Sequence, residues 1–287
     1  MAGAKEITSK IKSIQNTKKV TSALEMVSAS KIKKSQDLMR ATRPYSRLLR
    51  KMMSHLGKAN PEYRHPFTIK RDEVKKVSYI IVSTDRGQCG GLNMNLFKLA
   101  IADARQWQDK GVALNLVALG KKAAAYFRNF RVEIVASASG FGDRPNINKL
   151  IGSIKVLLDD YRAGSVDRVY LAYNDFINTM AQKPVLVQLL PLPESDESDL
   201  ADIWDYIYEP DAEKLLDTVL VRYIETTVYQ AILENQASEH AARMVAMKNA
   251  TENAAELIDE LKLARNKARQ AAITQEISEI VAGAAAV

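Results

Sequence analysis

The sequence predicts an α/β protein in which the two ends of the chain form long paired helices and the middle forms a doubly wound, mostly parallel sheet. Three observations carry this prediction. Residues 211–282 contain neither glycine nor proline, where average usage would place about eight or nine. Ten of the twelve glycines and seven of the eight prolines fall between Gly57 and Pro210. Within these limits apolar runs alternate between strand and helix periods, which is typical of βαβ folds.

The N-terminal residues 1–58 are predicted as one helix of a coiled coil. Pro44 is expected to end or kink this helix near Arg43, after which helical spacing resumes as far as Gly57. The stretch has too little apolar surface to form a core alone, so it needs a partner helix. Its apolar stripe is expected at Ile7, Ile11, Ile14, Val20, Leu24, Val27 and Ile32.

The middle of the chain is predicted as a linker at 59–73, an α/β domain at 74–191 and an acidic connector at 192–210. Alternating strand and helix signals in the domain predict parallel strands with right-handed crossovers. The expected strands are Val77–Ser83, Val112–Leu119, Val132–Ala136, Val166–Tyr173 and Val185–Leu190. The expected helices are Leu92–Lys110, Lys121–Asn129 and Ile147–Arg162.

Residues 211–287 are predicted as a single long helix, the second helix of the coiled coil. Roughly 70 residues at about 1.5 Å each would reach on the order of 100 Å. The N-terminal helix is too short to cover this length, so the last turns are expected to contact another protein. The expected seam is Met247, Ala250, Ala254, Leu257, Leu261, Ala264, Ala268 and Ala271, followed on a rotated face by Ile273, Ile277, Ile280 and Ala284.

Composition excludes several classes of protein. No window approaches the 18 to 20 apolar residues of a membrane span, and the N-terminus lacks the apolar core of a signal peptide. Cys89 is the only cysteine, and three histidines lie in unrelated segments, so no metal site is expected. The net charge of +7 is concentrated at the start, because residues 1–71 hold 17 Lys and Arg against 4 Asp and Glu.

The turn STDRGQCGGLN (residues 83–93) follows the first predicted strand and precedes a helix, where nucleotide-binding folds place a phosphate loop. Its G-x-x-G-G spacing is neither a dinucleotide fingerprint nor a Walker loop. Cys89 has no histidine nearby to act as its base. We therefore expect a structural turn, with no catalytic residue and no cofactor. A nucleotide-dependent enzyme with coiled-coil arms is the alternative.

Basic residues on the N-terminal helix also suggest nucleic-acid binding. Aromatic residues for base stacking are absent until Tyr45, which weakens this alternative. The same charges would suit an acidic protein partner. The cluster comprises Lys31, Lys33, Lys34, Arg40 and Arg43.

Three separated motifs, in order along the chain, resemble one family. They are SIQNTKKVTSALEMVSASK (13–31), STDRGQCGGLN (83–93) and RQAAITQEISEIVAGA (269–284). Together they are similar to the γ subunit of F-type ATP synthases, and the similarity runs along essentially the whole chain. The resemblance implies an antiparallel coiled coil of the terminal helices and a Rossmann-like α/β domain.

The resemblance also implies a function: a central-stalk rotor that couples rotation of a c-ring to the conformations of catalytic β subunits, without catalysis of its own. Implied partners are three α and three β subunits, the ε subunit and the c-ring, with no nucleic acid and with membrane association only through the c-ring. A bacterial protein on the cytoplasmic face of the inner membrane is expected. The positions matching the family's contacts between shaft and ring are Glu25, Lys31, Lys33, Arg269, Gln270, Thr274 and Glu276.

Overall fold

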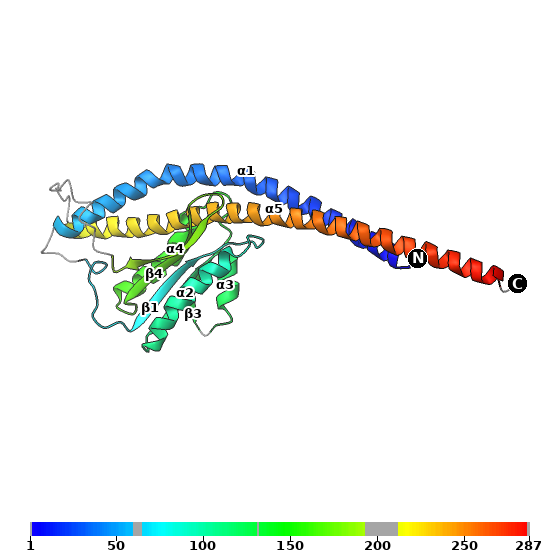
Figure 1. Cartoon of the computed structure of the whole chain (residues 1–287). Helices are drawn as coiled ribbons and strands as arrows, with labels where there is room; N and C mark the ends of the chain where they lie inside the picture. The colour runs from blue at the N-terminus through cyan, green and yellow to red at the C-terminus, as the bar shows by residue number, and fades with distance from the viewer. Residues whose placement is uncertain (1, 60–64, 131, 193–211, 286–287) are drawn as a thin grey trace. The chain divides into compact units, whose positions relative to one another are not determined.

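The structure is a computed structural model that describes residues 2–59, 65–130, 132–192 and 212–285 (Figure 1). Two very long helices begin and end the chain, and strands alternate with shorter helices between them. In chain order the elements are α1 (Ala2–Ala59), β1 (Lys76–Val82), α2 (Leu92–Asp109), β2 (Ala113–Leu119), α3 (Lys121–Phe127), β3 (Glu133–Ala138), α4 (Asn148–Arg162), β4 (Arg168–Phe176), β5 (Gln182–Leu190) and α5 (Ala212–Ala285).

The strands form one sheet in the order β3-β2-β1-β4-β5. Strands β3, β2, β1 and β4 run parallel to one another, and the edge strand β5 is antiparallel to β4. The predicted mostly parallel sheet is confirmed. β1 lies at the centre because its run KVSYIIV can be buried on both faces, and six of its seven residues are.

Each face of the sheet is covered by different helices (Figure 1). Side chains of α2 and α3, among them Leu96 and Phe127, pack on Tyr79 and Ile81 of β1. On the other face α4 and the first half of α5 pack on the alternate residues of the same strands. The period-2 alternation of β1 thus divides one apolar strand between two cores.

The chain forms two compact units. One comprises residues 30–242, with the sheet, α2 to α4 and the parts of α1 and α5 within that range; the other comprises residues 1–29 and 243–287. Both long helices therefore pass from one unit into the other. The predicted acidic connector at 192–210 lies, apart from Leu192, outside the described residues.

Helix α1 does not end near Arg43, so the expectation of a helix end there is wrong. Its 58 residues run without a break through Pro44 to Ala59. Pro44 is exposed, so water can bond to the Arg40 carbonyl for which proline offers no N–H group. Burial of α1 side chains on both sides of the proline, at Met39 and Leu49, outweighs the single missing hydrogen bond.

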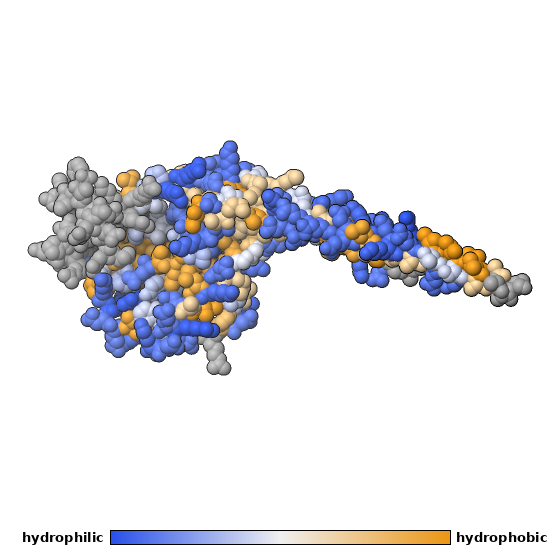
Figure 2. Space-filling model, in the orientation of Figure 1, coloured by the Kyte–Doolittle hydropathy of each residue, from blue (hydrophilic) through white to orange (hydrophobic). Residues whose placement is uncertain are grey.

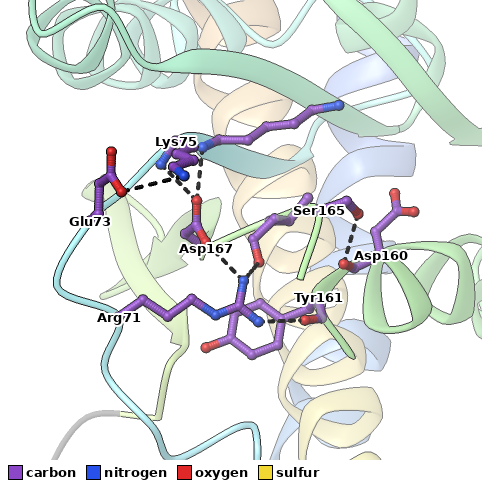
Figure 3. A network of polar contacts seen from close by, with 9 residues as sticks. Arg71, Glu73, Lys75, Asp160, Tyr161, Ser165 and Asp167 are labelled. Atoms are coloured by element: carbon purple, nitrogen blue, oxygen red, sulfur yellow. Dashed lines mark hydrogen bonds and ion pairs between the residues drawn. The ribbon is translucent and has the colours of Figure 1, made fainter. Parts of the chain in front are cut away.

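A carboxylate with 6% exposure fixes the point where β1 and β4 begin (Figure 3). Asp167 accepts the backbone N–H groups of Lys75 and Lys76, at 2.7 and 3.0 Å, and one N–H of Arg71 at 2.8 Å. The same guanidinium donates to the carbonyls of Tyr161 and Val166. Burial alone would raise the pKa of Asp167, but these donors outweigh it and lower that pKa.

Candidate functional site

The smaller unit is a pair of helices, residues 2–29 of α1 and 243–285 of α5, that run antiparallel (Figure 1). The Thr21 hydroxyl lies 2.7 Å from the Thr251 hydroxyl across the pair. Buried or half-buried positions on α5 recur at alternating steps of four and three, as in a coiled coil. They are Met247, Thr251, Ala254, Ile258, Leu261, Arg265, Ala268 and Ala272.

Part of the predicted seam on α5 is wrong. Met247, Ala254, Leu261 and Ala268 lie in the seam as expected, and Ala250 is half-buried beside it. Leu257, however, is 44% exposed, while its neighbour Ile258 is 6% exposed. Ala264 and Ala271, also predicted, are exposed. Thr251 and Arg265 occupy seam positions that a search for apolar residues passes over.

Part of the predicted stripe on α1 is also wrong. Ile11 and Ile32 are buried and Ile7, Ile14 and Leu24 are half-buried, as expected, but two valines are not. Val20 and Val27 are 57% and 52% exposed, whereas Thr21 and Ser28 are buried. Each buried hydroxyl bonds to a carbonyl of its own helix, Thr21 to Lys18 and Ser28 to Leu24. A small side chain whose hydroxyl is hydrogen-bonded within its own helix lets the two helices approach closely. At these seam positions the size of the side chain therefore matters more than its hydrophobicity.

The last turns of α5 are not covered by any part of the chain that the structure describes. From Ile273 to Ala284 every residue whose burial is described is exposed. Large hydrophobic side chains gather here, as Figure 2 shows at the C-terminal end. Ile273, Ile277, Ile280 and Val281 are 47%, 56%, 71% and 63% exposed, at spacings that place them along one side of the helix.

The seven site residues expected from sequence fall into two groups. Arg269, Gln270, Thr274 and Glu276 are all exposed on the last turns of α5. On α1, Lys33 is exposed and Glu25 and Lys31 are half-buried. Lys31 differs from the rest because its ammonium already donates to Asp143 at 2.8 Å.

Asp143 belongs to a loop that sequence reasoning passed over. The β3–α4 loop, residues 139–147, has the sequence SGFGDRPNI. Gly140 and Gly142 both have positive φ, at +74° and +65°, a conformation that glycine adopts at little cost. The G-x-G-D pattern was the available signal, but its partner Lys31 is 112 residues away in the sequence.

The STDRGQCGGLN turn is held together by its own polar groups. The Asn93 side chain accepts from the Thr84 N–H at 3.2 Å and donates to the Thr84 hydroxyl at 2.7 Å. Asp85 accepts the N–H groups of Lys121 and Gly140, at 3.0 and 2.7 Å. Cys89 is 3% exposed. The turn thus links the end of β1 to the start of α3 and to the loop that follows β3.

The described part of the chain offers neither a metal site nor a membrane-spanning helix. Among those residues no group of three or more His, Cys, Asp and Glu side chains is placed to hold a metal ion. Nor is any helix, over its described residues, both long and apolar enough to cross a membrane.

Solved structures share this fold. The rotor of the Euglena gracilis mitochondrial ATP synthase contains a chain with a TM-score of 0.68 at 19% identity, over 95% of this chain and 99% of that one. The central stalk and c-ring of the Tetrahymena thermophila mitochondrial ATP synthase contain one with a TM-score of 0.59 at 22% identity, over 80% and 99%. The fold is thus of the class found in rotor and central-stalk chains of ATP synthases.

Sequence comparison gives the particular family. A family model described as ATP synthase matches residues 3–287. The ATP synthase gamma chain of Xanthomonas campestris pv. campestris strain B100 is 57% identical over 287 residues, and that of Stenotrophomonas maltophilia strain R551-3 is 56% identical, each covering the whole of both chains. This chain belongs to the ATP synthase gamma chain family.

Proposed function

We propose that this chain is the central-stalk rotor subunit of a proton-translocating F-type ATP synthase. The observation that carries the proposal is the identity of 57% to a gamma chain over the full length of both proteins. The structure adds a physical reason, since α5 ends in turns whose described residues are exposed and include four large hydrophobic side chains. A helix end of this kind is suited to a socket in another protein.

The proposed mechanism uses stiffness and asymmetry. Two helices packed along a seam resist twisting better than one, and their outer faces differ. Three otherwise equivalent β subunits then meet different surfaces of the shaft, which biases each toward a different conformation. Rotation of the c-ring by proton flow turns the shaft and moves the three sites through these states in sequence. ATP is made and hydrolysed on the β subunits, and this chain supplies no catalytic group or cofactor.

The proposed partners are three α and three β subunits around the shaft, and the ε subunit and c-ring at its base. Exposure supports a role against the ring for Arg269, Gln270, Thr274 and Glu276, because their side chains are available to a partner. On α1 the same argument supports Lys33 and, with less exposed surface, Glu25. We further propose that the protein acts on the cytoplasmic face of a bacterial inner membrane and reaches the membrane only through the c-ring.

We also propose that different segments of the chain have different roles in the rotor. Residues 1–58 and 211–287 supply the shaft, and the α/β domain at 74–191 supplies a body to which other rotor subunits attach. The segments 59–73 and 192–210 connect the body to the helices. In this proposal the body sets the direction of the shaft and has no ligand of its own.

Native purification tests the proposal. The tagged chain, isolated from its own membranes in mild detergent, should bring with it two larger subunits, each in three-to-one excess, and ATPase activity that the isolated chain lacks. Salt-sensitive DNA retention with no such subunits would instead favour the nucleic-acid alternative. Tight calorimetric binding of ATP or NAD by the isolated chain would favour the enzyme alternative.

A further inference from the structure

The β3–α4 loop is held by contacts from several elements of the larger unit. Its Gly142 carbonyl accepts from the Gln236 amide of α5 at 2.5 Å, and its Pro145 carbonyl accepts from the Tyr229 hydroxyl, also of α5, at 3.2 Å. The Gly140 N–H donates to Asp85, in the turn after β1, at 2.7 Å. With two glycines at positive φ, the loop has a shape set in advance of any contact with α1.

Asp143 projects from this loop toward α1. The Lys31 ammonium donates to its carboxylate at 2.8 Å. The pKa of Asp143 is lowered first by this hydrogen bond, against a smaller opposing effect of burial, and further by the charges of Lys31, His240 and Arg86. These three basic side chains come from α1, α5 and the turn after β1, so Asp143 is the acidic centre of a junction of three elements.

The position of the junction along both helices is informative. Lys31 is the second residue of α1 within the unit 30–242, and Gln236 and His240 lie in the last two turns of α5 within it. The loop therefore contacts both helices where they leave the unit that contains the sheet.

We propose that the β3–α4 loop is a clasp that fastens both shaft helices to the α/β domain, with Asp143 and Lys31 as its closing contact. This inference rests on the proposed rotor function and adds a positioning role within it. It assigns Lys31 to a contact inside the chain, so that the charge of Lys31 is not free for an acidic loop of the surrounding ring. Asp143 and Lys31 do not touch a nucleotide; they hold the shaft in register with the domain that turns it.

The solvent exposure of Lys31 and Asp143 determines what breaking their contact should change. The two side chains are 33% and 60% exposed, and a pair of this kind adds little to global stability. Loss of the Lys31–Asp143 contact should therefore lower coupling and increase local opening of the loop, while the global fold stays intact. A contact that only stabilised the fold would instead change the free energy of unfolding.

A charge swap tests the clasp in the complete membrane-bound complex. The variants are Lys31→Glu, Asp143→Lys and the double variant with both. Proton pumping per ATP hydrolysed should fall about two-fold or more in each single variant, because like charges now meet, and should return close to the starting value in the double variant. Amide exchange of residues 140–143 in the purified chain should rise in each single variant and return in the double.

Lys33 provides the matched control, since it is a lysine on the same helix that is exposed. The combination Lys33→Glu with Asp143→Lys should not restore the amide exchange of residues 140–143, and this readout is independent of the ring contact proposed for Lys33. If the double variant loses as much coupling as Lys31→Glu, the clasp proposal is wrong, and a contact of Lys31 with the surrounding ring would explain the loss instead. If the double variant restores the slow amide exchange of the loop but not the coupling, the Lys31–Asp143 contact closes the loop but does not transmit torque. Failure of the unmodified chain to assemble or couple would contradict the proposed function itself, while the exchange readout would still decide whether the pair closes the loop.

Discussion

The hydroxyls of Thr21 and Thr251 lie 2.7 Å apart, with one on each helix of the terminal pair. Each also lies within hydrogen-bond distance of a carbonyl of its own helix, Thr21 of Lys18 and Thr251 of Met247. Because the pair has two hydroxyl protons, one threonine donates to the other, and the second donates to the carbonyl of its own helix. Both groups are thus satisfied, and Thr21 is only 9% exposed. The contact allows two small side chains to meet where a coiled coil ordinarily places large apolar ones.

We expect Thr21→Leu to destabilise the helical pair by about 1–3 kcal/mol, because the larger side chain overfills a seam built for a small one. Thr21→Ser, which keeps the hydroxyl and removes one methyl, should cost roughly 1 kcal/mol or less. Urea unfolding followed by far-ultraviolet circular dichroism measures both. A conventional apolar seam predicts the reverse order, so a leucine variant more stable than the starting protein would contradict this account.

Regular patterns in the central domain were sufficient to predict its elements. The strand expected at Val77–Ser83 is Lys76–Val82, and the helix expected at Ile147–Arg162 is Asn148–Arg162. Such segments are specified locally, by apolar runs that end at glycine and proline. Parallel order follows from the βαβ alternation, which leaves few arrangements open.

The helical seams were harder to predict because the physical signal differs. On α5 both Leu257 and Ile258 are apolar, and only the partner helix decides that Ile258 is buried and Leu257 is not. On α1 the buried positions include Thr21, Ser28 and Ser35, which no hydrophobic period would select. The pairing of Lys31 with Asp143 was out of reach, since it depends on how a loop is placed by the fold.

Asp167 offers a test of the polar cluster that joins β1 to β4. We expect Asp167→Asn to lower the free energy of unfolding by roughly 3 kcal/mol, because the substitution leaves the Arg71 guanidinium without its carboxylate. Asp160→Asn is the control, since the contact of Asp160 with Ser165 uses its backbone carbonyl. Denaturant unfolding at neutral pH compares the two, and equal stability of both variants would contradict the role given to Asp167.

The same residue fixes a pH dependence. Because the pKa of Asp167 is lowered in the folded protein, its stabilisation is present above the ordinary aspartate value of 3.8 and is lost as the pH falls through the folded pKa. The asparagine variant should therefore lose less stability than the starting protein on acidification.

Glu234 predicts a pH dependence of the opposite sign. This α5 residue is 9% exposed and accepts from the Gln230 amide at 3.1 Å. Burial raises its pKa above the ordinary value of 4.5; nearby Asp175 adds to this, and Gln230 and Arg43 partly offset it. Stability from this site is thus fully present below pH 4.5 and is lost as the pH rises through the folded pKa.

We expect Glu234→Gln to remove that loss, so that the variant is more stable than the starting protein at pH 8, by about 1 kcal/mol, with little difference at pH 4. Glu256→Gln, at an exposed position of the same helix, should change neither value. Thermal unfolding across this pH range measures the effect. A glutamine variant that is less stable at pH 8 would show that the charged carboxylate is required.

Leu261 tests the stiffness on which the proposed rotor depends. It lies half-buried in the seam of the helical pair, far from both ends of α5. Leu261→Pro removes one backbone hydrogen bond and introduces a clash with the preceding turn, at a cost of about 3 kcal/mol or more. We expect this variant to assemble but to lose most ATP synthesis driven by a proton gradient, because a kinked shaft cannot transmit torque evenly.

Two controls separate stiffness from contact. Leu261→Ala keeps the helix and removes only packing, so it should retain much of the coupled activity. Deletion of residues 282–287 removes small side chains at the end of the chain and should be better tolerated than the proline. Normal yields of ATP from the proline variant would contradict the stiff-shaft mechanism. Loss from all three variants alike would place the requirement in surface contacts along α5, since only the proline variant bends the helix.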